Sequence, residues 1–528
     1  MRRHQIKCSF TILGLVSFLF LERRAMPNWE YAGIKKIMIP LSAEEITVEA
    51  IKKWMPHVLT VHERNAQKIE YYQKYVDGLF QPIDDKMRSS TKSSERNNRI
   101  KQNNAFFMVS FKEGFMLGDK REFAPKSDEE SGEMIYFDRF LTDASFYSKD
   151  LSVKHNLYTS GIGTSFIMPR SDIFYSDGNF TRLKTAGEGY DADNDSPFVY
   201  ESLDGTKNAV VYTSQIGAKG LGDLFCFNIS QFQDNYGISN SLYTVYTRDF
   251  IVQLDSDMNI VGDIIPTSPS YREIPMVEHS INDRRIGIVE ITESMLDGIN
   301  TLTSNCVDNV VDVANKIVVF LGCKAEGVDV DSMYENGAIC IPPTNGMSVP
   351  SVDTFDVGMN YSDVNVLIHE IMTRCYDIVG IPLTGSVSGN GNNQAAYVGG
   401  GWTNAMTVIK RDIRALESSD RELLKKMLAI CKLNPDNKLK NIHANQIDIK
   451  YNIKITDDVF SYSQALQNLF DCDVPLEHIL SAIPLWGDIK TVAADWGRNI
   501  EKAKEEEKEN ANLESNDNQI ESSDDVDI

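Results

Sequence analysis

One long amphipathic stretch, residues 288–321, constrains the fold more than any other feature of the sequence. Apolar residues recur in it at steps of three and four, which is the spacing of one face of an α-helix. They are Ile288, Ile291, Met295, Ile299, Leu302, Cys306, Val310, Val313 and Ile317. We therefore expect a single helix that ends at Gly322. At 1.5 Å per residue it would be roughly 45–50 Å long, longer than a compact domain usually needs.

Acidic residues occupy the other faces of this predicted helix. They are Glu290, Glu293, Asp297, Asp308 and Asp312. These side chains can form an ordinary solvated surface or the acidic wall of a channel. The sequence alone favours the ordinary surface.

Two more long helices are predicted downstream. Residues 362–379 place Val364, Leu367, Ile371, Cys375 and Ile378 on one face, and a third helix begins near Trp402 and ends at Asn434 and Pro435. Between them, residues 385–401 are rich in Gly, Ser and Asn and have high conformational freedom. Between the first and second helices, residues 324–359 are punctuated by Gly and Pro, which suits short strands and turns.

The rest of the chain is mixed in character. Residues 43–80 and 99–115 have helical patterns, whereas in residues 158–254 the period shortens toward two, which indicates a β-rich region. Residues 446–455 alternate like a strand, and short helices are expected within residues 461–498. We predict an α+β fold that is mainly helical.

The charge balance limits what the chain can bind. A net charge of −23 argues against a dedicated basic DNA-binding domain, because affinity for duplex DNA comes largely from Lys and Arg displacing counterions. An acidic surface can still let DNA slide, since it repels the phosphate backbone. The eight cysteines form no Cys-x-x-Cys pair, and we interpret them as reduced thiols that fill the core.

Common catalytic and metal-binding motifs are missing from the sequence. There is no Gly-x-x-x-x-Gly-Lys-Ser/Thr phosphate loop and no Gly-x-Ser-x-Gly elbow. His369 and Glu370 lack the second His of a metalloprotease helix, so we expect an ordinary surface pair. Residues 255–266 imitate a calcium loop, but Ile260 and Pro266 stand where Gly and Glu are required, so a turn between strands is expected.

Four segments, taken in their order and spacing, resemble the portal protein family of tailed bacteriophages, in the branch typical of phages of Gram-positive bacteria. They are NNRIKQNNAFFMVSFKEGFMLGD at 97–119, YTSGIGTSFIMP at 158–169, IPMVEHSIN at 274–282 and HILSAIPLWGDI at 478–489. The resemblance covers about residues 45–504.

The resemblance implies a portal fold with a wing, a long-helix stem, a small α/β clip, a tunnel loop and a helical crown. The implied parts are the wing at 26–285, stem helix 1 at 286–322, the clip at 323–360, stem helix 2 at 361–384, the tunnel loop at 385–401, the long wing helix at 402–435 and the crown at 436–500. Residues 501–528 are expected to be a disordered acidic tail. Residues 1–25 carry an apolar run that is too short to span a bilayer, and we interpret them as a mis-assigned start ahead of Met26.

The resemblance also assigns contact residues. Clip contacts to the packaging motor would come from Lys324, Glu326, Asp329, Asp331, Tyr334, Glu335, Pro342 and Pro343. The tunnel loop around DNA would contain Ser386, Ser388, Gly389, Asn390, Gly391, Asn392, Asn393, Gln394, Ala395 and Tyr397. This loop has no Lys where the family often has one, so we expect a neutral, flexible collar. The acidic residues of the first stem helix would form the channel wall.

The implied function is structural and not enzymatic. The family forms a ring, commonly of twelve subunits, at one capsid vertex, and double-stranded DNA passes through it without sequence specificity during packaging and ejection. Implied partners are the terminase large subunit, scaffolding and major capsid proteins, and a head-completion or adaptor protein. No membrane and no cofactor are expected, and the protein would be found in the host cytoplasm during assembly and then in the virion. The alternatives are another head-tail connector or pore component, or a metal-dependent nuclease that uses residues 188–195.

Overall fold

The computed structural model describes residues 29–85, 98–126, 132–170, 174–176, 181–183, 191–216, 222–233, 239–267, 271–314, 317–321, 338–341, 351–355, 361–382, 401–435, 437–453, 466–470, 472, 475, 478–479 and 496–498. The chain divides into two compact units. The first comprises Met1–Gly114 and Pro125–Ile447, and the second comprises Phe115–Ala124 and Asp448–Ile528. The architecture is α+β, as the sequence predicts.

The N-terminal helical pattern corresponds to the short 3-10 turn η1 (Ala43–Glu45) and the long helix α2 (Val48–Val76). Thr47 caps α2, because its side chain accepts a hydrogen bond from the Ala50 amide at 3.2 Å. The helix ends before Gly78, whose φ of +71° is the left-handed conformation that glycine adopts readily. The second predicted helix is α3 (Asn104–Leu117), followed by α4 (Met134–Asp143) and α5 (Phe146–Ser160).

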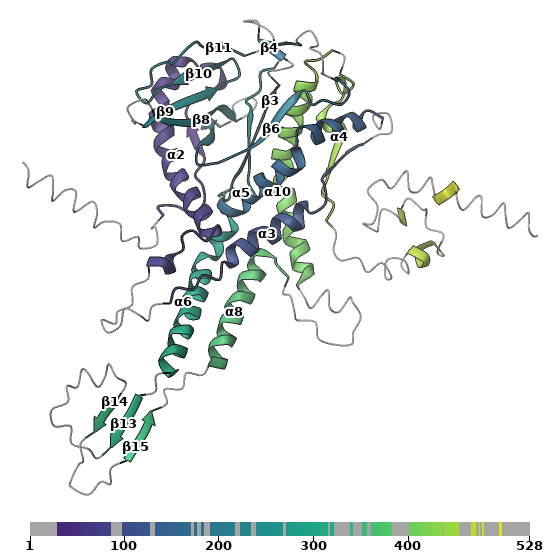
Figure 1. Cartoon of the computed structure of the whole chain (residues 1–528). Coiled ribbons are helices and arrows are strands. Elements are labelled where there is room, and N and C mark those ends of the chain that lie inside the picture. The colour runs from purple at the N-terminus through teal and green to yellow at the C-terminus, as the bar shows by residue number, and fades with distance from the viewer. Residues whose placement is uncertain are drawn as a thin grey trace, which may run out of the picture. The chain divides into compact units, whose positions relative to one another are not determined.

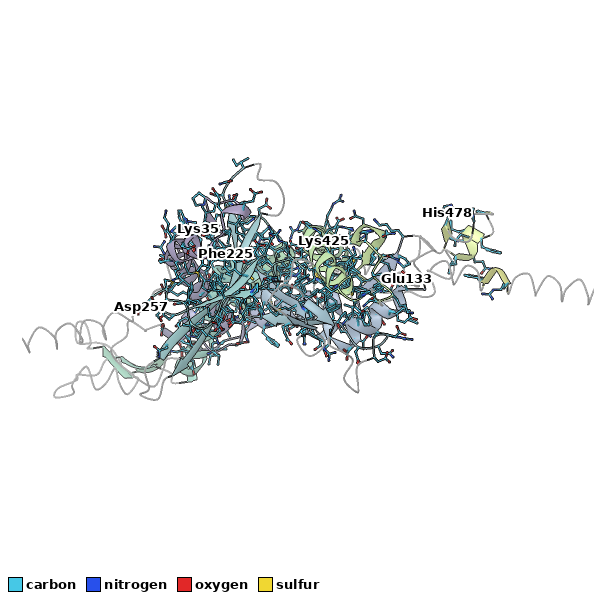
Figure 2. All side chains as sticks on the ribbon, turned by 90° about the horizontal axis from the view of Figure 1, so that it is seen from above. Lys35, Glu133, Phe225, Asp257, Lys425 and His478 are labelled. Carbon is cyan, nitrogen blue, oxygen red and sulfur yellow. The ribbon has the colours of Figure 1, made fainter. Side chains whose placement is uncertain are left out.

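The larger sheet has six strands in the order β1-β7-β8-β9-β10-β11, and α2 covers it (Figure 1). Its strands are β1 (Ile37–Ile39), β7 (Asn208–Thr213), β8 (Asp223–Gln233), β9 (Ser239–Tyr246), β10 (Phe250–Leu254) and β11 (Ile265–Pro266). All neighbours are antiparallel except β1 and β7. Ile51 and Val58 of α2 pack in one buried cluster with Phe225 of β8. Phe225 is labelled in Figure 2. The β-rich prediction is confirmed, but its first residues, at Tyr158, belong to α5.

A second sheet joins distant parts of the chain. It has the order β12-β3-β6, made of β12 (Met276–His279), β3 (Gly163–Pro169) and β6 (Phe198–Leu203). Both α5 and α10 (Trp402–Cys431) pack on its strands. The long third helix is thus confirmed, and Ile409, Leu416, Leu423, Met427 and Ile430 are buried along it. The small strands β4 (Phe174–Ser176) and β5 (Thr181–Leu183) form a separate hairpin.

The first long helix is shorter than the sequence predicts. Helix α6 spans Ile288–Ala314, and residues 317–321 form strand β13 (Ile317–Leu321). The expectation of one helix to Gly322 was therefore wrong, because the run Ile-Val-Val-Phe-Leu pairs with two other strands, β14 (Ala338–Ile341) in parallel and β15 (Ser351–Phe355) in antiparallel. The chain then returns through α8 (Tyr361–Val379), as predicted.

In the second unit, Arg121 donates a hydrogen bond to the Tyr451 hydroxyl at 3.0 Å. Strand β2 (Glu122–Pro125) pairs with β16 (Ile447–Lys450), which confirms the strand expected near residue 446. None of the helices in the described ranges combines the length and apolar content needed to cross a bilayer.

Candidate functional site

Helices α6 and α8 lie side by side and lead to the sheet β13–β15, so the segment expected to form the clip is inserted between the two helices (Figure 1). The start of α6 is tightly built. The Asn282 side chain donates to the Ile286 carbonyl and accepts from the Ile286 amide, both at 2.9 Å. Gly161 has a φ of +96°, and a Cβ there would lie 2.1 Å from the Arg285 carbonyl oxygen, so only glycine fits beside this turn.

An ion pair buried at the first turn of α6 attaches it to α2. The Lys68 ammonium of α2 lies 2.7 Å from Glu290 Oε1, with 1% and 12% of the two side chains exposed. Lys68 also donates to the carbonyls of Tyr31 and Gly33. Because an ammonium has three hydrogens, these partners satisfy the buried charge.

Tyrosines of α2 bind the next two carboxylates. Tyr71 and Tyr72 donate to the two oxygens of Glu293 at 2.6 and 3.0 Å, and Tyr75 donates to Asp297 at 2.8 Å. Burial and the Glu293 carboxylate raise the pKa of both Tyr71 and Tyr72, which keeps the phenols protonated as donors. Burial raises the pKa of Asp297 to about 6, and the Tyr75 hydrogen bond only partly opposes this. We call Glu290, Glu293 and Asp297 with their four α2 partners the carboxylate ladder.

The middle of α6 is lined by the segment that precedes α3. The Gln102 amide donates to Asn300 and the Ile100 amide donates to Ser304, at 3.0 and 2.9 Å. Asn98 donates through its backbone and its side chain to Asp308, at 3.0 and 2.8 Å. Asp308 is 2% exposed, so these hydrogen bonds replace its contact with water.

This arrangement corrects the expected acidic wall. Glu293 and Asp308 are buried, and Glu290 and Asp297 are partly buried against α2, so these four side chains form no exposed acidic face. A helical pattern shows which residues share a face but not which face meets a neighbouring element. Here α2 contacts Glu290, Glu293 and Asp297, and the segment before α3 contacts Asp308. The side chain of Asp312 lies outside the described residues.

Apolar side chains are instead exposed on the helix pair. Ile291 of α6 is 46% exposed, and Val366, Leu367 and Ile378 of α8 are 64%, 45% and 49% exposed. Among the apolar positions of α8 whose burial is described, residues 364–379, only Cys375 and Val379 are buried. A helix that leaves this much apolar surface uncovered is typical of a protein that packs against another chain.

The expected tunnel-loop residues, from Ser386 to Tyr397, and the expected clip-contact residues, from Lys324 to Pro343, lie outside the described residues. The two ends of the loop segment are described. Phe107 of α3 contacts Tyr376 of α8, with ring centroids 5.7 Å apart. Phe111 of α3 contacts Trp402 of α10, with ring centroids 6.4 Å apart. Asn404 donates to the Asp377 carbonyl at 2.9 Å. The last turn of α8 and the first turn of α10 are thus held together.

Other sequence candidates have ordinary structural roles. Glu370 pairs with Arg374 on the exposed surface of α8, and the Asp255 carboxylate accepts the amides of Asp257 and Asn259 in a turn after β10, as expected. Of the loop proposed for a nuclease, residues 191–195 form a turn closed by Asp191 and Asp195. Within the described ranges, no group of His, Cys, Asp and Glu could hold a metal ion. Cysteines 226, 375 and 431 are buried free thiols.

A serine, a histidine and an aspartate also meet in the interior. Ser165 Oγ lies 3.0 Å from His279 Nε2. His279 Nδ1 is hydrogen-bonded to Ser419 Oγ at 2.9 Å and lies 3.6 Å from Asp420 Oδ1. The three residue types are those of a hydrolase triad, but Ser165 and His279 have no exposed surface. A substrate carbonyl could not reach the serine, so the group serves the packing of α10 on the sheet.

Sequence reasoning missed Lys68 and the ladder tyrosines. Lys68, Tyr71, Tyr72 and Tyr75 recur at steps of three and four on α2, and that periodicity was the available signal for a polar helix contact. Their partners lie more than two hundred residues away in sequence, so the pairing itself was not visible.

Comparison with known proteins relates the chain to a described family. Residues 56–379 match the model of a family described as phage portal protein, SPP1 Gp6-like. This range includes α6, β13–β15 and α8, and it covers more than half of the chain. No curated protein matches the chain.

Proposed function

The chain belongs to the family of SPP1 Gp6-like phage portal proteins, and we propose that it is the ring subunit that forms the channel for DNA packaging and ejection at one capsid vertex. Membership in this structural family implies a ring oligomer in the capsid. We further propose about twelve subunits, which act passively while the terminase motor hydrolyses ATP.

The observation that carries this proposal is the apolar surface of the α6–α8 pair. Val366, Leu367 and Ile378 are exposed on a helix that its own subunit covers on one side only. Burial of apolar surface is favourable by about 25 cal/mol per Å², so these side chains favour contact with neighbouring subunits. In a closed ring every subunit covers this face of the next one.

The roles of the inserted segments follow from their place in the chain. The sheet β13–β15 and its connections interrupt the helix pair and are proposed as the clip that docks the terminase and later the head-completion protein. Residues 385–401 connect α8 to α10 and are proposed as the tunnel loop. The carboxylate ladder is assigned to holding α6 on α2, which leaves Asp312 as the one residue of the expected acidic wall still proposed to face the channel.

Electron microscopy and native mass measurement of the full chain test the proposal. We expect rings with a central hole and a mass near twelve times 59.5 kDa. A chain that stays monomeric at high concentration, with the scaffolding protein present, would contradict it. A Val366→Asp, Leu367→Asp variant should remain folded but should not form rings, whereas the matched variant Lys74→Asp on the exposed surface of α2 should assemble normally.

A further inference from the structure

The outer face of α10 carries a basic stripe, although the chain has a net charge of −23. The stripe consists of Lys410, Arg414, Arg421, Lys425 and Lys432, at steps of four and seven residues. Residues at these steps share one face of a helix with 3.6 residues per turn. At 1.5 Å per residue the stripe is about 33 Å long.

Packing of the opposite face of α10 turns the stripe outward. Ile409, Leu416, Leu423 and Met427 are buried, and α10 packs on β3 and β12. On the stripe, Lys410, Arg414, Lys425 and Lys432 are exposed, and Arg421 is partly buried. Lys425 is labelled on this helix in Figure 2.

Most of the charged groups of the stripe form no ion pair with the described residues of the subunit. Among the described residues, no carboxylate lies within 4.0 Å of the charged groups of Lys410, Arg414 or Lys425. Arg421 lies 3.7 Å from the exposed Glu417 and donates to the Ala444 carbonyl at 3.2 Å, and Lys432 Nζ lies 3.3 Å from His443 Nδ1. Lys426, on the buried side of the same helix, differs, since it contacts both Glu422 and Asp223. The buried cation Lys426 therefore stabilises the fold, whereas Lys410, Arg414 and Lys425 of the stripe remain available to an outside anion.

We propose that the α10 stripe binds the phosphate backbone of duplex DNA without reading its sequence. The proposal rests on the proposed function, which brings duplex DNA to this protein. B-DNA carries one negative charge per about 1.7 Å of its axis, so a line of cations about 33 Å long can pair with phosphates in many registers. Long Lys and Arg side chains on an exposed helix suit such contacts, which position the duplex but carry no sequence information. The repulsion from the rest of the acidic chain keeps the contact weak and local.

The test compares two variants with the same change in net charge. K410E/R414E/K425E reverses the stripe, and K35E/K53E/K207E reverses three exposed lysines elsewhere in the first unit. Binding of the assembled full chain to a fluorescent duplex of about 60 base pairs, longer than the stripe, is measured by anisotropy between about 50 and 300 mM NaCl, where phosphate contacts depend steeply on salt. The mass of each assembly is measured in parallel.

We expect the stripe variant to bind at least about tenfold more weakly than wild type at low salt, with a log affinity versus log salt slope smaller by about two to three, because each phosphate contact contributes about 0.9. The control variant should change affinity by less than about threefold, since distant charges are screened. Equal losses in both variants, or no loss in either, would overturn the proposal. Loss of assembly in the stripe variant alone would also overturn it, by assigning the stripe to a subunit interface. If wild type forms no ring but its DNA binding still depends on the stripe, the proposed function fails while the stripe assignment stands.

Discussion

Helices α6 and α8 lie side by side but are stabilised in different ways. The inward face of α6 is largely polar. Each of its carboxylates, Asn300 and Ser304 forms at least one hydrogen bond within the same subunit, to Lys68, to three tyrosines or to residues 98–102. Most of α8 is exposed, and its apolar side chains at 366, 367 and 378 are uncovered. The subunit therefore holds α6 through hydrogen bonds along its polar face, whereas it holds α8 through its contact with α6 and at its last turn. Substitutions at four places test this difference.

The largest effect is expected at Lys68. Lys68→Met leaves the Glu290 carboxylate and two backbone carbonyls without their buried cation, which should lower the free energy of unfolding by about 3–5 kcal/mol. Lys74→Met, which removes the exposed pair with Glu70 on the same helix, should change it by less than about 0.5 kcal/mol. Urea denaturation of the unassembled chain measures both, and equal values would contradict a special role for Lys68.

A smaller effect is expected at Glu293. Glu293→Ala removes the acceptor of both Tyr71 and Tyr72, and two buried hydroxyls without partners should cost about 2–3 kcal/mol. Glu417→Ala on the exposed surface of α10 is the matched control and should be nearly neutral. If the two variants unfold at the same urea concentration, the tyrosine hydrogen bonds do not hold α6.

Asp297 should make stability depend on pH. Its folded-state pKa is raised from 3.8 to about 6. The contribution of Asp297 to the free energy of unfolding is therefore fully present below pH 4 and is lost as the pH rises through 6. Asp297→Asn does not titrate and so lacks this loss. Between pH 4 and 7 its free energy of unfolding should therefore rise by about 1 kcal/mol relative to wild type. This value is reduced because the site is partly exposed. Thermal unfolding across this pH range measures the difference. An equal gain for Asp377→Asn, at an exposed position on α8, would show that any lost carboxylate has this effect.

The smallest effect on folding is expected on α8. Val366→Ser and Leu367→Ser change exposed side chains and should alter the free energy of unfolding by no more than about 0.5 kcal/mol. The same variants should raise the protein concentration needed for ring assembly, as measured by mass photometry. Leu296→Ser on the buried face of α6 provides the contrast, because it should destabilise the subunit by about 3 kcal/mol. Strong destabilisation by the α8 variants would mean that α8, too, is packed within its subunit.

Periodicity predicted α8 and α10 closely, because each has one apolar face and clear ends at glycine or proline. The end of α6 was missed because β-branched residues such as Val318 and Val319 fit the apolar positions of a helix as well as those of a strand, and the pairing with β14 and β15 decided between the two. The orientation of Glu290, Glu293 and Asp297 could not be predicted either, since it depends on α2, more than two hundred residues earlier in the chain.

The pairing of β13 with β15 has a mechanical consequence for the two helices that lead into it. Five residue pairs join these strands, and the pair nearest the helices is Ile317 with Phe355. If α6 slides along α8, all five pairs are loaded together, parallel to the strands. If the two helices spread apart, the pairs open one at a time from Ile317. The helix pair therefore resists force along the helix axes better than it resists splaying.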